Sequence, residues 1–486
     1  MKTITSRQMD TLDMNCEYLG LSRLQLMENA GSAVAAEVMN LPTRERVLVV
    51  AGLGNNGGDG SVAARHLIGY EVTVLLLGKT SEVKTPEAAR NMSILKSMGI
   101  PVIEVREVSE LDPDSFLDCD VIVDALFGTG IKGSIREPYA SAIDLMNNAP
   151  SKVVSVDVPS GMDPDGGEFE KAVRADVTVT FHLPKPGLLE PAAAEYVGEI
   201  AVADIGIPPE AENVVGPGDV KLVTGRSPDS HKGDGGRVLI IGGGAYSGAP
   251  ALSGLAALRA GADIVTVAAP KSVAGIIASF SPNLIVKKLS KKRLHRQDIP
   301  ILEILIQAHD VVVIGMGLGR DDETLAAIRE ILPLCNKVVV DADGLAAIET
   351  PLSQYGCEMI ITPHAGEFRA LGRDKVPHDL DRRVGMINRF AADNNAVVLL
   401  KGPEDIISNG EQSKVNHTGN PGMTVGGTGD VLAGITGALF AKNSAIEAAM
   451  AAAYICGRAG DMVYEELGVG LLATDIIDSI PAAMKR

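Results

Sequence analysis

The chain has 486 residues, of which 46% are hydrophobic and 22% are charged, and its formal net charge is -18. This length allows about two to four domains that each bury a core, and the acidic balance excludes a general affinity for nucleic acid or anionic membranes. The five cysteines form no C-x-x-C pair, and we find neither a signal-peptide core nor an apolar run of about 18 residues. We therefore expect a reduced, cytoplasmic protein without a membrane span.

The first half of the chain alternates short apolar runs with segments of helical pattern. Helices are expected over 22–39, 61–67, 86–98 and 136–146. Strands are expected at 47–51, 72–77, 121–124, 153–156, 177–181 and 199–206. Continuous apolar strands separated by helices indicate a parallel sheet that is covered on both faces.

A stretch rich in proline, glycine and acids, 205–220, precedes a second series of the same kind. Strands are expected at 238–241, 264–267, 311–314, 338–340, 359–361 and 397–400, with final helices starting near Gly429 and Ala445. The sequence thus predicts an α/β protein with two doubly wound sheets, in domains 1–218 and 219–486. Ligands of such sheets bind beyond the carboxyl ends of the strands, so the residues after each strand are the candidates for function.

In the first half, the loop GLGNNGGDG at 52–60 matches the dinucleotide pattern G-x-G-x-x-G between a strand and a helix. The match is weak on its own, because the next strand ends in Gly78 and Lys79 rather than in an acid. Asp59 stands inside the loop, where it would repel a pyrophosphate. The amides of Asn55 and Asn56 with this carboxylate suit a hard cation or a hydroxyl-rich ligand better.

Asp124 and Asp157 each end a strand of the first half, so their carboxylates are expected to converge on one crevice. The alternative for each is a helix cap or a turn former. The segments 124–133, 157–166 and 182–187 are therefore the candidates that accompany the glycine-rich loop.

In the second half, the stretch GNPGMTVGGTGDVLAGITGAL at 419–439 combines a glycine-rich start with a helix. It lacks the Walker pattern, but a helix N-terminus can bind phosphate through its backbone N–H groups. Asp430 would repel a stored phosphate, yet it could deprotonate a hydroxyl while those N–H groups hold a phosphoryl in transfer. The alternative is a helix whose glycines only pack and whose aspartate only caps.

Two further residues of the second half follow strands. His364 stands after Pro363 and near Glu367, and Lys401 ends a strand and could meet phosphates. A structural histidine and a solvated lysine are the alternatives. The basic run KKLSKKRLHR at 287–296 is interpreted as a solvated face rather than as an anion site.

Together these motifs resemble the family of bifunctional NAD(P)HX repair enzymes over nearly the whole chain. The resemblance is carried by GLGNNGGDG, DALFGTGIKG and VPSGMDPDG in the first half, and by HKGDGGRVLIIGGGAYSGAP, GMGLG, DADGL, TPHAGEF, KGPED and NPGMTVGGTGDVLAG in the second. The stretch GTGD at 427–430 is also similar to the motif of ribokinase-like kinases. The resemblance implies a Rossmann-like epimerase domain followed by a ribokinase-like dehydratase domain.

For the first domain, the resemblance implies interconversion of the two epimers of NADH or NADPH hydrated at carbon six of the nicotinamide ring. Asp157 becomes the candidate acid/base. A potassium ion would be held by Asn56, Asp124 and Ser160. The binding site of the hydrated dinucleotide would be lined by Asn55, Asn56, Gly57, Gly58, Asp59, Gly128, Thr129, Gly130, Ile131, Lys132, Gly133, Ser134 and Asp157.

For the second domain, the resemblance implies dehydration of the S epimer at the expense of ADP or ATP, with magnesium on the nucleotide phosphates. Asp430 would be the catalytic base, and Gly317, His364 and Asp430 would contact the substrate. The nucleotide would be bound by Lys401, Gly402, Pro403, Glu404, Asp405, Asn420, Pro421, Gly422, Met423, Thr424, Val425, Gly426, Gly427, Thr428 and Gly429.

Two other functions are compatible with the residues alone. One is a small-molecule kinase fused to a non-catalytic ligand-binding module, which would release a stable phosphorylated product. The other is a first half that binds a ligand without turnover. A homo-oligomer is expected, and the sequence leaves open the preference between ADP and ATP and between the two dinucleotides.

Overall fold

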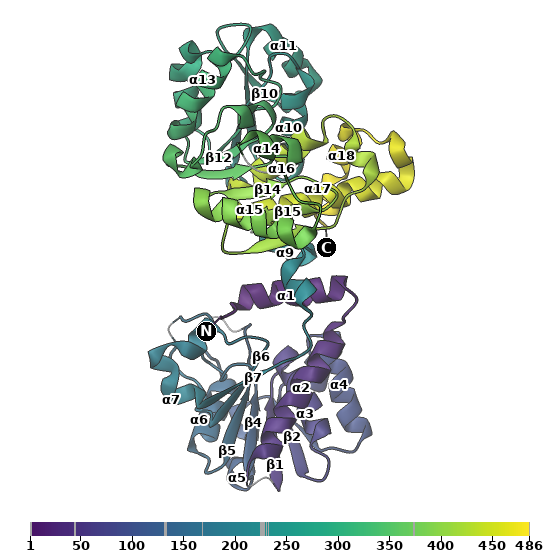
Figure 1. The fold of residues 1–486 in the computed structure, drawn as a ribbon. Helices are drawn as coiled ribbons and strands as arrows, with labels where there is room; N and C mark the ends of the chain where they lie inside the picture. The colour runs from purple at the N-terminus through teal and green to yellow at the C-terminus, as the bar shows by residue number, and fades with distance from the viewer. Residues whose placement is uncertain are drawn as a thin grey trace. The chain divides into compact units, whose positions relative to one another are not determined.

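The computed structural model describes residues 2–42, 45–130, 134–167, 169–223, 229, 231, 233–372 and 375–485. The chain forms two compact units, Met1–Pro209 and Glu210–Arg486, each shown in Figure 1. The short helices α8 (Pro209–Asn213) and α9 (Pro217–Val223) connect them in sequence. Val214 bridges to Val415, and Asp219 pairs with Lys414 at 2.7 Å. The segment 210–218, assigned to the first domain from the sequence, thus packs with the second unit.

The first unit is built on a seven-stranded sheet in which every strand is parallel to its neighbours. The strands, in spatial order, are β3 (Val102–Val105), β2 (Glu71–Leu77), β1 (Arg46–Ala51), β4 (Val121–Ala125), β5 (Lys152–Val156), β6 (Val177–Phe181) and β7 (Glu199–Ala203). The order reverses between β1 and β4, so the loops after these two strands face the same crevice.

Helices cover both faces of this sheet (Figure 1). The helices of this unit are α1 (Ser6–Tyr18), α2 (Arg23–Asn40), α3 (Asn55–His66), α4 (Pro86–Ser97), α5 (Pro113–Leu117), α6 (Tyr139–Asn148) and α7 (Ala194–Val197). One face buries Phe116 of α5 and Ile143 of α6 against Leu48 and Ile122. The opposite face packs Met27 of α2 against Val62 of α3.

The second unit has a nine-stranded sheet whose order reverses between β8 and β11. Its strands, in spatial order, are β10 (Ile285–Lys288), β9 (Ile264–Ala269), β8 (Arg237–Ile241), β11 (Val311–Ile314), β12 (Lys337–Val340), β13 (Glu358–Ile361), β14 (Val397–Leu400), β15 (Asp405–Ser408) and β16 (Ser413–Asn416). β10 to β14 are parallel, and β14, β15 and β16 pair antiparallel. The predicted α/β class with two sheets is confirmed.

The helices of the second unit leave two apolar layers on the sheet. They are α10 (Gly248–Arg259), α11 (Lys271–Phe280), α12 (Ile299–Gln307), α13 (Asp322–Ile331), α14 (Ala365–Ala370), α15 (Leu380–Asn394), α16 (Thr428–Phe440), α17 (Ala445–Leu467) and α18 (Ala473–Ala483). α16 and α17 are buried along most of their length. In the part of the chain that is described, no helix is both long and apolar enough to cross a membrane.

The elements that the sequence did not predict include the strands β3, β10, β15 and β16 and the helices α1, α5, α7, α9 and α18. A larger correction concerns the stretch GNNGGDG, which was expected as a loop before a helix at 61–67. The structure has it as the first turns of α3, which begins at Asn55. Glycine and asparagine are poor helix formers, but close packing on β1 and β4 overrides that preference here.

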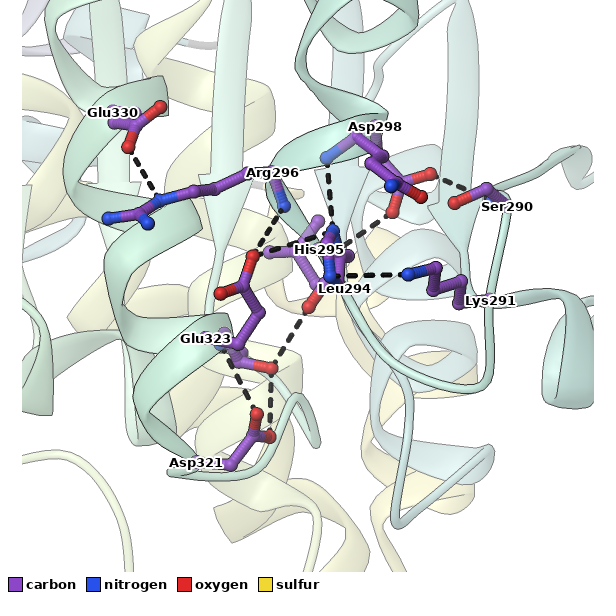
Figure 2. Close-up of polar contacts among 11 residues, drawn as sticks. Ser290, Lys291, Leu294, His295, Arg296, Asp298, Asp321, Glu323 and Glu330 are labelled. Atoms are coloured by element: carbon purple, nitrogen blue, oxygen red, sulfur yellow. Dashed lines mark hydrogen bonds and ion pairs between the residues drawn. The ribbon is translucent and has the colours of Figure 1, made fainter.

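The basic segment 287–296 is held against α13 by acidic partners (Figure 2). Arg296 pairs with Glu330 at 2.7 Å, and His295 lies 3.4 Å from Glu323. The buried Asp298 accepts hydrogen bonds from the backbone N–H groups of Ser290 and His295. These contacts favour the structural interpretation of the segment over an anion site.

The contact between α10 and α16 is close enough to be tested at a single glycine. A Cβ on Gly434 would lie 2.1 Å from the carbonyl oxygen of Ser253. We predict that Gly434→Ala destabilises the second unit by about 1–3 kcal/mol, because the helices must separate. Calorimetric unfolding measures the change. Gly248→Ala in α10 is the matched control, since a Cβ there meets nothing within 4 Å, and equal stability of both variants would contradict the packing.

Candidate functional site

The first unit contains a cavity of about 410 Å³ beyond the carboxyl ends of its central strands. Its wall is formed by the loops after β1, β4, β5 and β6 and by residues of α1, α2 and α3. Seven of the predicted substrate residues line it: Asn55, Asn56, Asp59, Gly128, Thr129, Gly130 and Asp157.

The remaining predictions for this site fall outside the lining that is described. Gly57 and Gly58 lie in the first turns of α3, behind the cavity wall, and Ser134 is exposed. Ile131, Lys132 and Gly133 lie outside the described residues. Their assignment stays a prediction.

Glycines allow α3 to begin directly against the end of β1. A Cβ on Gly52 would lie 2.1 Å from the carbonyl oxygen of Leu126, and one on Gly57 would lie 2.0 Å from the carbonyl oxygen of Gly52. Neither contact is possible for a larger residue without moving the backbone. The close fit brings the helix start, with Asn55 and Asn56, to the loop that follows β4.

A buried polar cluster lies at one side of this cavity. Asp124 is fully buried, and its Oδ2 accepts hydrogen bonds of 2.8 Å from Ser155 Oγ and from the backbone N–H of Ser160. Ser160 Oγ accepts a 2.9 Å hydrogen bond from the N–H of Phe127. A Cβ on Gly128 would lie 3.0 Å from Asn56 Oδ1, which places that amide beside the same loop.

The charge of Asp124 is not balanced by an ion pair with any residue that the structure describes. Burial raises the pKa of Asp124, and the hydrogen bonds from Ser160 and Ser155 only partly offset this. The side-chain nitrogen of Asn56 is buried and has no hydrogen-bond partner among the described residues. The three predicted potassium ligands thus lie close together and offer several oxygen atoms, and the carboxylate among them has no described counter-charge. They are Asn56, Asp124 and Ser160.

Asp157 is held by a lysine that the sequence analysis did not assign. Its backbone has φ of 65°, a left-handed conformation that is unusual for a residue other than glycine. Lys185 is fully buried, and its ammonium donates to Asp157 Oδ1, to Thr180 Oγ1 at 3.3 Å and to the carbonyl of Phe181 at 3.2 Å. Lys185 lies in the segment 182–187, which was named as a candidate from the sequence without assigning this residue a role.

Two more carboxyls share the cavity with Asp157. Burial, followed by the charges of Asp157 and Asp13, raises the pKa of Asp59 well above its usual value. Burial also raises the pKa of Asp13 to about 6, although the charge of Arg23 opposes the rise. The cavity therefore concentrates acidic groups with unequal proton affinities, as catalytic sites often do.

The second unit has a cavity of about 780 Å³ that is lined from β14, the turn before β15, α17 and the start of α16. The predicted nucleotide residues in its wall are Lys401, Gly402, Pro403, Asp405, Asn420, Pro421, Met423, Thr424, Val425, Gly427, Thr428 and Gly429, and His364 joins them. Glu404, Gly422 and Gly426 lie in the same segments without lining the cavity.

The first residues of the helix α16, Gly427, Thr428 and Gly429, line this cavity. Its N-cap residue Gly427 has φ of 101°, which a residue with a side chain rarely adopts, and no side chain caps the helix. The first N–H groups of a helix have no intrahelical partner and carry a partial positive charge. Thr428 fixes the turn, since its hydroxyl donates to the carbonyl of Met423 at 3.0 Å.

Asp430 stands in the first turn of α16, beside a buried ion pair. Lys401 Nζ donates to Asp341 Oδ1 at 2.7 Å, and Thr362 Oγ1 donates to the same oxygen at 2.8 Å. A Cβ on Gly429 would lie 3.4 Å from Lys401 Nζ, so the pair adjoins the helix start. Burial would lower the pKa of Lys401, but the charge of Asp341 raises it overall.

These surroundings raise the pKa of Asp430 to about 7. Burial is the largest cause, the charge of Asp341 adds to it, and the charge of Lys401 opposes it. The carbonyl of Asp430 accepts a 2.7 Å hydrogen bond from Ser253 Oγ, which fixes the backbone. A carboxyl that titrates near neutral pH is suited to general-base catalysis.

The rim of the same cavity is held by further polar contacts. Asp405 accepts hydrogen bonds from the N–H of Gly402 at 3.0 Å and from Asn416 at 3.1 Å, and burial raises its pKa to about 6. Asn420 donates to Asp461 at 3.0 Å. The turn before β15 and the loop before α16 are thereby fixed on either side of the opening.

The two residues predicted to contact the hydrated dinucleotide differ in their settings. His364 is exposed over 59% of its side chain and caps α14, because its Nδ1 accepts from the N–H groups of Gly366 and Glu367. Gly317 follows β11 with φ of 68°, near Tyr246, and does not line the described cavity. The structure places His364 in the cavity wall, whereas Gly317 and Asp430 are not among the lining residues; Asp430 directly follows Gly429, which is.

Comparison with known proteins relates both units to described families. A family model described as NAD(P)H-hydrate dehydratase matches residues 238–482, and one described as YjeF-related protein N-terminus matches residues 23–187. The bifunctional NAD(P)H-hydrate repair enzyme of Archaeoglobus fulgidus is 48% identical over 487 residues, covering 100% of this chain and 99% of the relative. The chain belongs to the family of bifunctional NAD(P)H-hydrate repair enzymes.

Other members of this repair-enzyme family match over similar lengths. The enzyme of the same name from Pyrobaculum aerophilum is 48% identical over 500 residues, covering 100% of this chain and 99% of the relative. Among solved structures, the ADP/ATP-dependent NAD(P)H-hydrate dehydratase of Bacillus subtilis, co-crystallized with ATP/Mg2+, is 25% identical with a TM-score of 0.48. That likeness covers 56% of this chain and 97% of the bacterial one.

Proposed function

We propose that this chain repairs hydrated nicotinamide dinucleotides in two steps, one in each unit. The first unit interconverts the R and S epimers of NAD(P)HX, and the second dehydrates the S epimer to NAD(P)H at the expense of ADP, giving AMP and phosphate. The observation that supports the proposal most directly is Asp430, with its pKa near 7, at a glycine-bounded helix start beside Lys401.

In the dehydration, Asp430 accepts the proton of the substrate hydroxyl as that oxygen attacks the terminal phosphoryl group. The N–H groups of Thr428 and Gly429 stabilise the negative charge on the phosphoryl oxygens. The lone pair of the ring nitrogen then expels phosphate, and loss of a proton from the neighbouring ring carbon restores NAD(P)H. Lys401 contributes positive charge to the phosphates, and His364 lies where it can orient the substrate.

Magnesium fits this cavity as an ion carried by the nucleotide. Among the described residues no group of three or more His, Cys, Asp or Glu side chains could hold a metal. Mg²⁺ is commonly bound through substrate phosphates with few protein ligands, and Glu367, 3.9 Å from Lys401 Nζ, is a carboxylate at this site. When bound, the ion would neutralise charge on the phosphates. ADP is proposed as the phosphoryl donor, with ATP as the alternative.

Potassium fits the polar cluster of the first unit. Asn56, Asp124 and Ser160 would hold it, because a buried carboxylate without a described counter-charge and two neutral oxygen donors suit a large monovalent cation. The ion would fix the loops after β4 and β5, which carry Gly128 and Asp157 into the cavity. We assign Asp157 to acid/base chemistry at the substrate hydroxyl.

We predict that Asp430→Asn lowers the rate of NADH formation from hydrated NADH and ADP by about 10²–10⁴-fold, because the hydroxyl loses its base. In the unaltered chain the rate should rise with pH through about 7, as Asp430 ionises. NADH absorbance and phosphate release, followed together, measure both. A phosphorylated product without phosphate release would instead support a simple kinase.

Asp322→Asn is the matched control for this substitution. Asp322 is likewise an acid in the first turn of a helix, α13, but it is exposed, and α13 contributes no residue to the cavity wall. Its variant should keep full activity. If Asp430→Asn performed as well as Asp322→Asn, the assignment of the base would be wrong.

We predict that K⁺ raises the thermal stability of the first unit and the epimerisation rate, relative to tetramethylammonium, and that Asp124→Asn abolishes both effects. K⁺ at 100 times its dissociation constant should add about 2.7 kcal/mol, because it binds the folded state. Calorimetry in the two salts measures the stability. The control is Asp118→Asn at an exposed acid of the same unit. A K⁺ response that survives Asp124→Asn would contradict the proposed ligand set.

A further inference from the structure

Epimerisation at carbon six requires two proton-transfer groups, and one carboxyl cannot fill both roles. If the hydroxyl leaves from one face of the ring and water returns to the other, one group must protonate the leaving oxygen and a second must deprotonate the incoming water. The two groups must therefore approach the ring from different sides. The first cavity was assigned one such group, Asp157, which leaves the second without a candidate.

Asp157 is well placed for one of these two roles only. It follows β5 at the floor of the cavity, and its carboxylate is fixed by the buried ammonium of Lys185. Thr180 Oγ1 and the N–H of Phe181 also donate to Asp157 Oδ1 at 3.3 Å. Three donors therefore fix the Asp157 carboxylate in place, and we assign it the proton-accepting role.

Asp13 differs from Asp157 in position and partners. It belongs to α1, which lies across one end of the sheet (Figure 1), and it lines the same cavity as Asp157. No ion pair or hydrogen bond joins its carboxyl to another described residue. Burial, the largest influence, raises its pKa to about 6, so a protonated form is accessible near neutral pH.

Asp59 is a weaker candidate than Asp13. It is fully enclosed in α3, and burial raises its pKa well above the usual value. A carboxyl that stays neutral can donate a hydrogen bond to the substrate, but it cannot alternate between acid and base within one cycle. Two carboxyls with separated proton affinities, one anionic and one protonated, are the usual basis of an acid/base pair.

We propose that Asp13 is the second acid/base group of the epimerase and works opposite Asp157; this inference rests on the proposed epimerase function. For one epimer, Asp13 gives its proton to the C6 hydroxyl, the C6–O bond breaks, and water leaves as the ring nitrogen's lone pair forms the C6=N1 bond. Water then adds to the other face, the C6–O bond forms again, and Asp157 takes the proton. For the other epimer the roles are exchanged, and solvent resets the protons between turnovers.

The first test uses the unaltered chain and isotopic water. One epimer of hydrated NADH is incubated with the unaltered chain in H₂¹⁸O without ADP. The other epimer is then recovered, and its mass is measured by mass spectrometry. The proposal predicts one ¹⁸O in each epimerised molecule, above the enzyme-free background. Epimerisation without ¹⁸O would overturn it, because the C6–O bond would not have broken. A chain that does not epimerise at all would instead refute the proposed function.

The second test assigns the residue. Asp13→Asn should lower kcat for epimerisation by about 10²–10⁴-fold with little change in KM, since the lost group acts in the transition state. Dehydration of the S epimer by the same sample should be unchanged, and calorimetry should show the first unit folded. Asp10→Asn, one turn earlier on α1 and outside the cavity lining, is the matched control. Equal kcat for the folded Asp13→Asn variant and the control would overturn the assignment.

Discussion

The chemistry of the second unit depends on the balance of charge around the start of α16. A carboxylate and a phosphoryl group repel each other, so they can share a site only where positive charge is supplied nearby. Here the supply comes from the helix N-terminus and from Lys401, which is itself paired with the buried Asp341. Burial and the charge of Asp341 raise the pKa of Asp430 to about 7, which suits the proposed role of this carboxyl as the base.

The first unit also brings several carboxyl groups together near positive charge, but it uses other residues to do so. Its cavity gathers Asp13, Asp59 and Asp157 around one buried ammonium, that of Lys185. Burial raises the pKa of Asp59 well above its usual value and the pKa of Asp13 to about 6, so these two carboxyls differ in their proton affinities, which is what proton transfer needs. Asp124, at the edge of this cavity, is the buried acid for which a potassium ion is the proposed counter-charge. Both units thus place carboxylates at strand ends, where an open α/β sheet leaves room for a ligand.

The sequence was sufficient to predict most of the fold because parallel strands are continuous apolar runs. Strands such as β1, β4 and β8 were found within a residue or two. The strand-end acids Asp124 and Asp157 and the helix-start acid Asp430 could also be selected, because strand ends and helix starts fix where such side chains emerge. The α3 start was misjudged because tertiary packing, through Gly52 and Gly57, made a helix of residues that disfavour one.

The sequence could not predict which charged side chains pair or lie together in the folded chain. Lys185 lies three residues after His182, just beyond β6, and belongs to no recognisable local pattern. Its burial against Asp157 depends on tertiary packing. The same holds for Asp13 on α1, which no motif singled out, and for the contact of Asp341 with Lys401 across β12 and β14. These partners decide the proton affinities on which the proposed mechanism depends.

The central claim is that the substrate hydroxyl is phosphorylated before it leaves. It is tested most directly with S-NADHX carrying ¹⁸O at C6, incubated with ADP and a chain in which Asp157→Asn prevents exchange of the label at the first site. The account predicts that the ¹⁸O appears in the released phosphate, because the oxygen that attacks phosphorus departs with it. Recovery of the ¹⁸O in water, with unlabelled phosphate, would contradict the account.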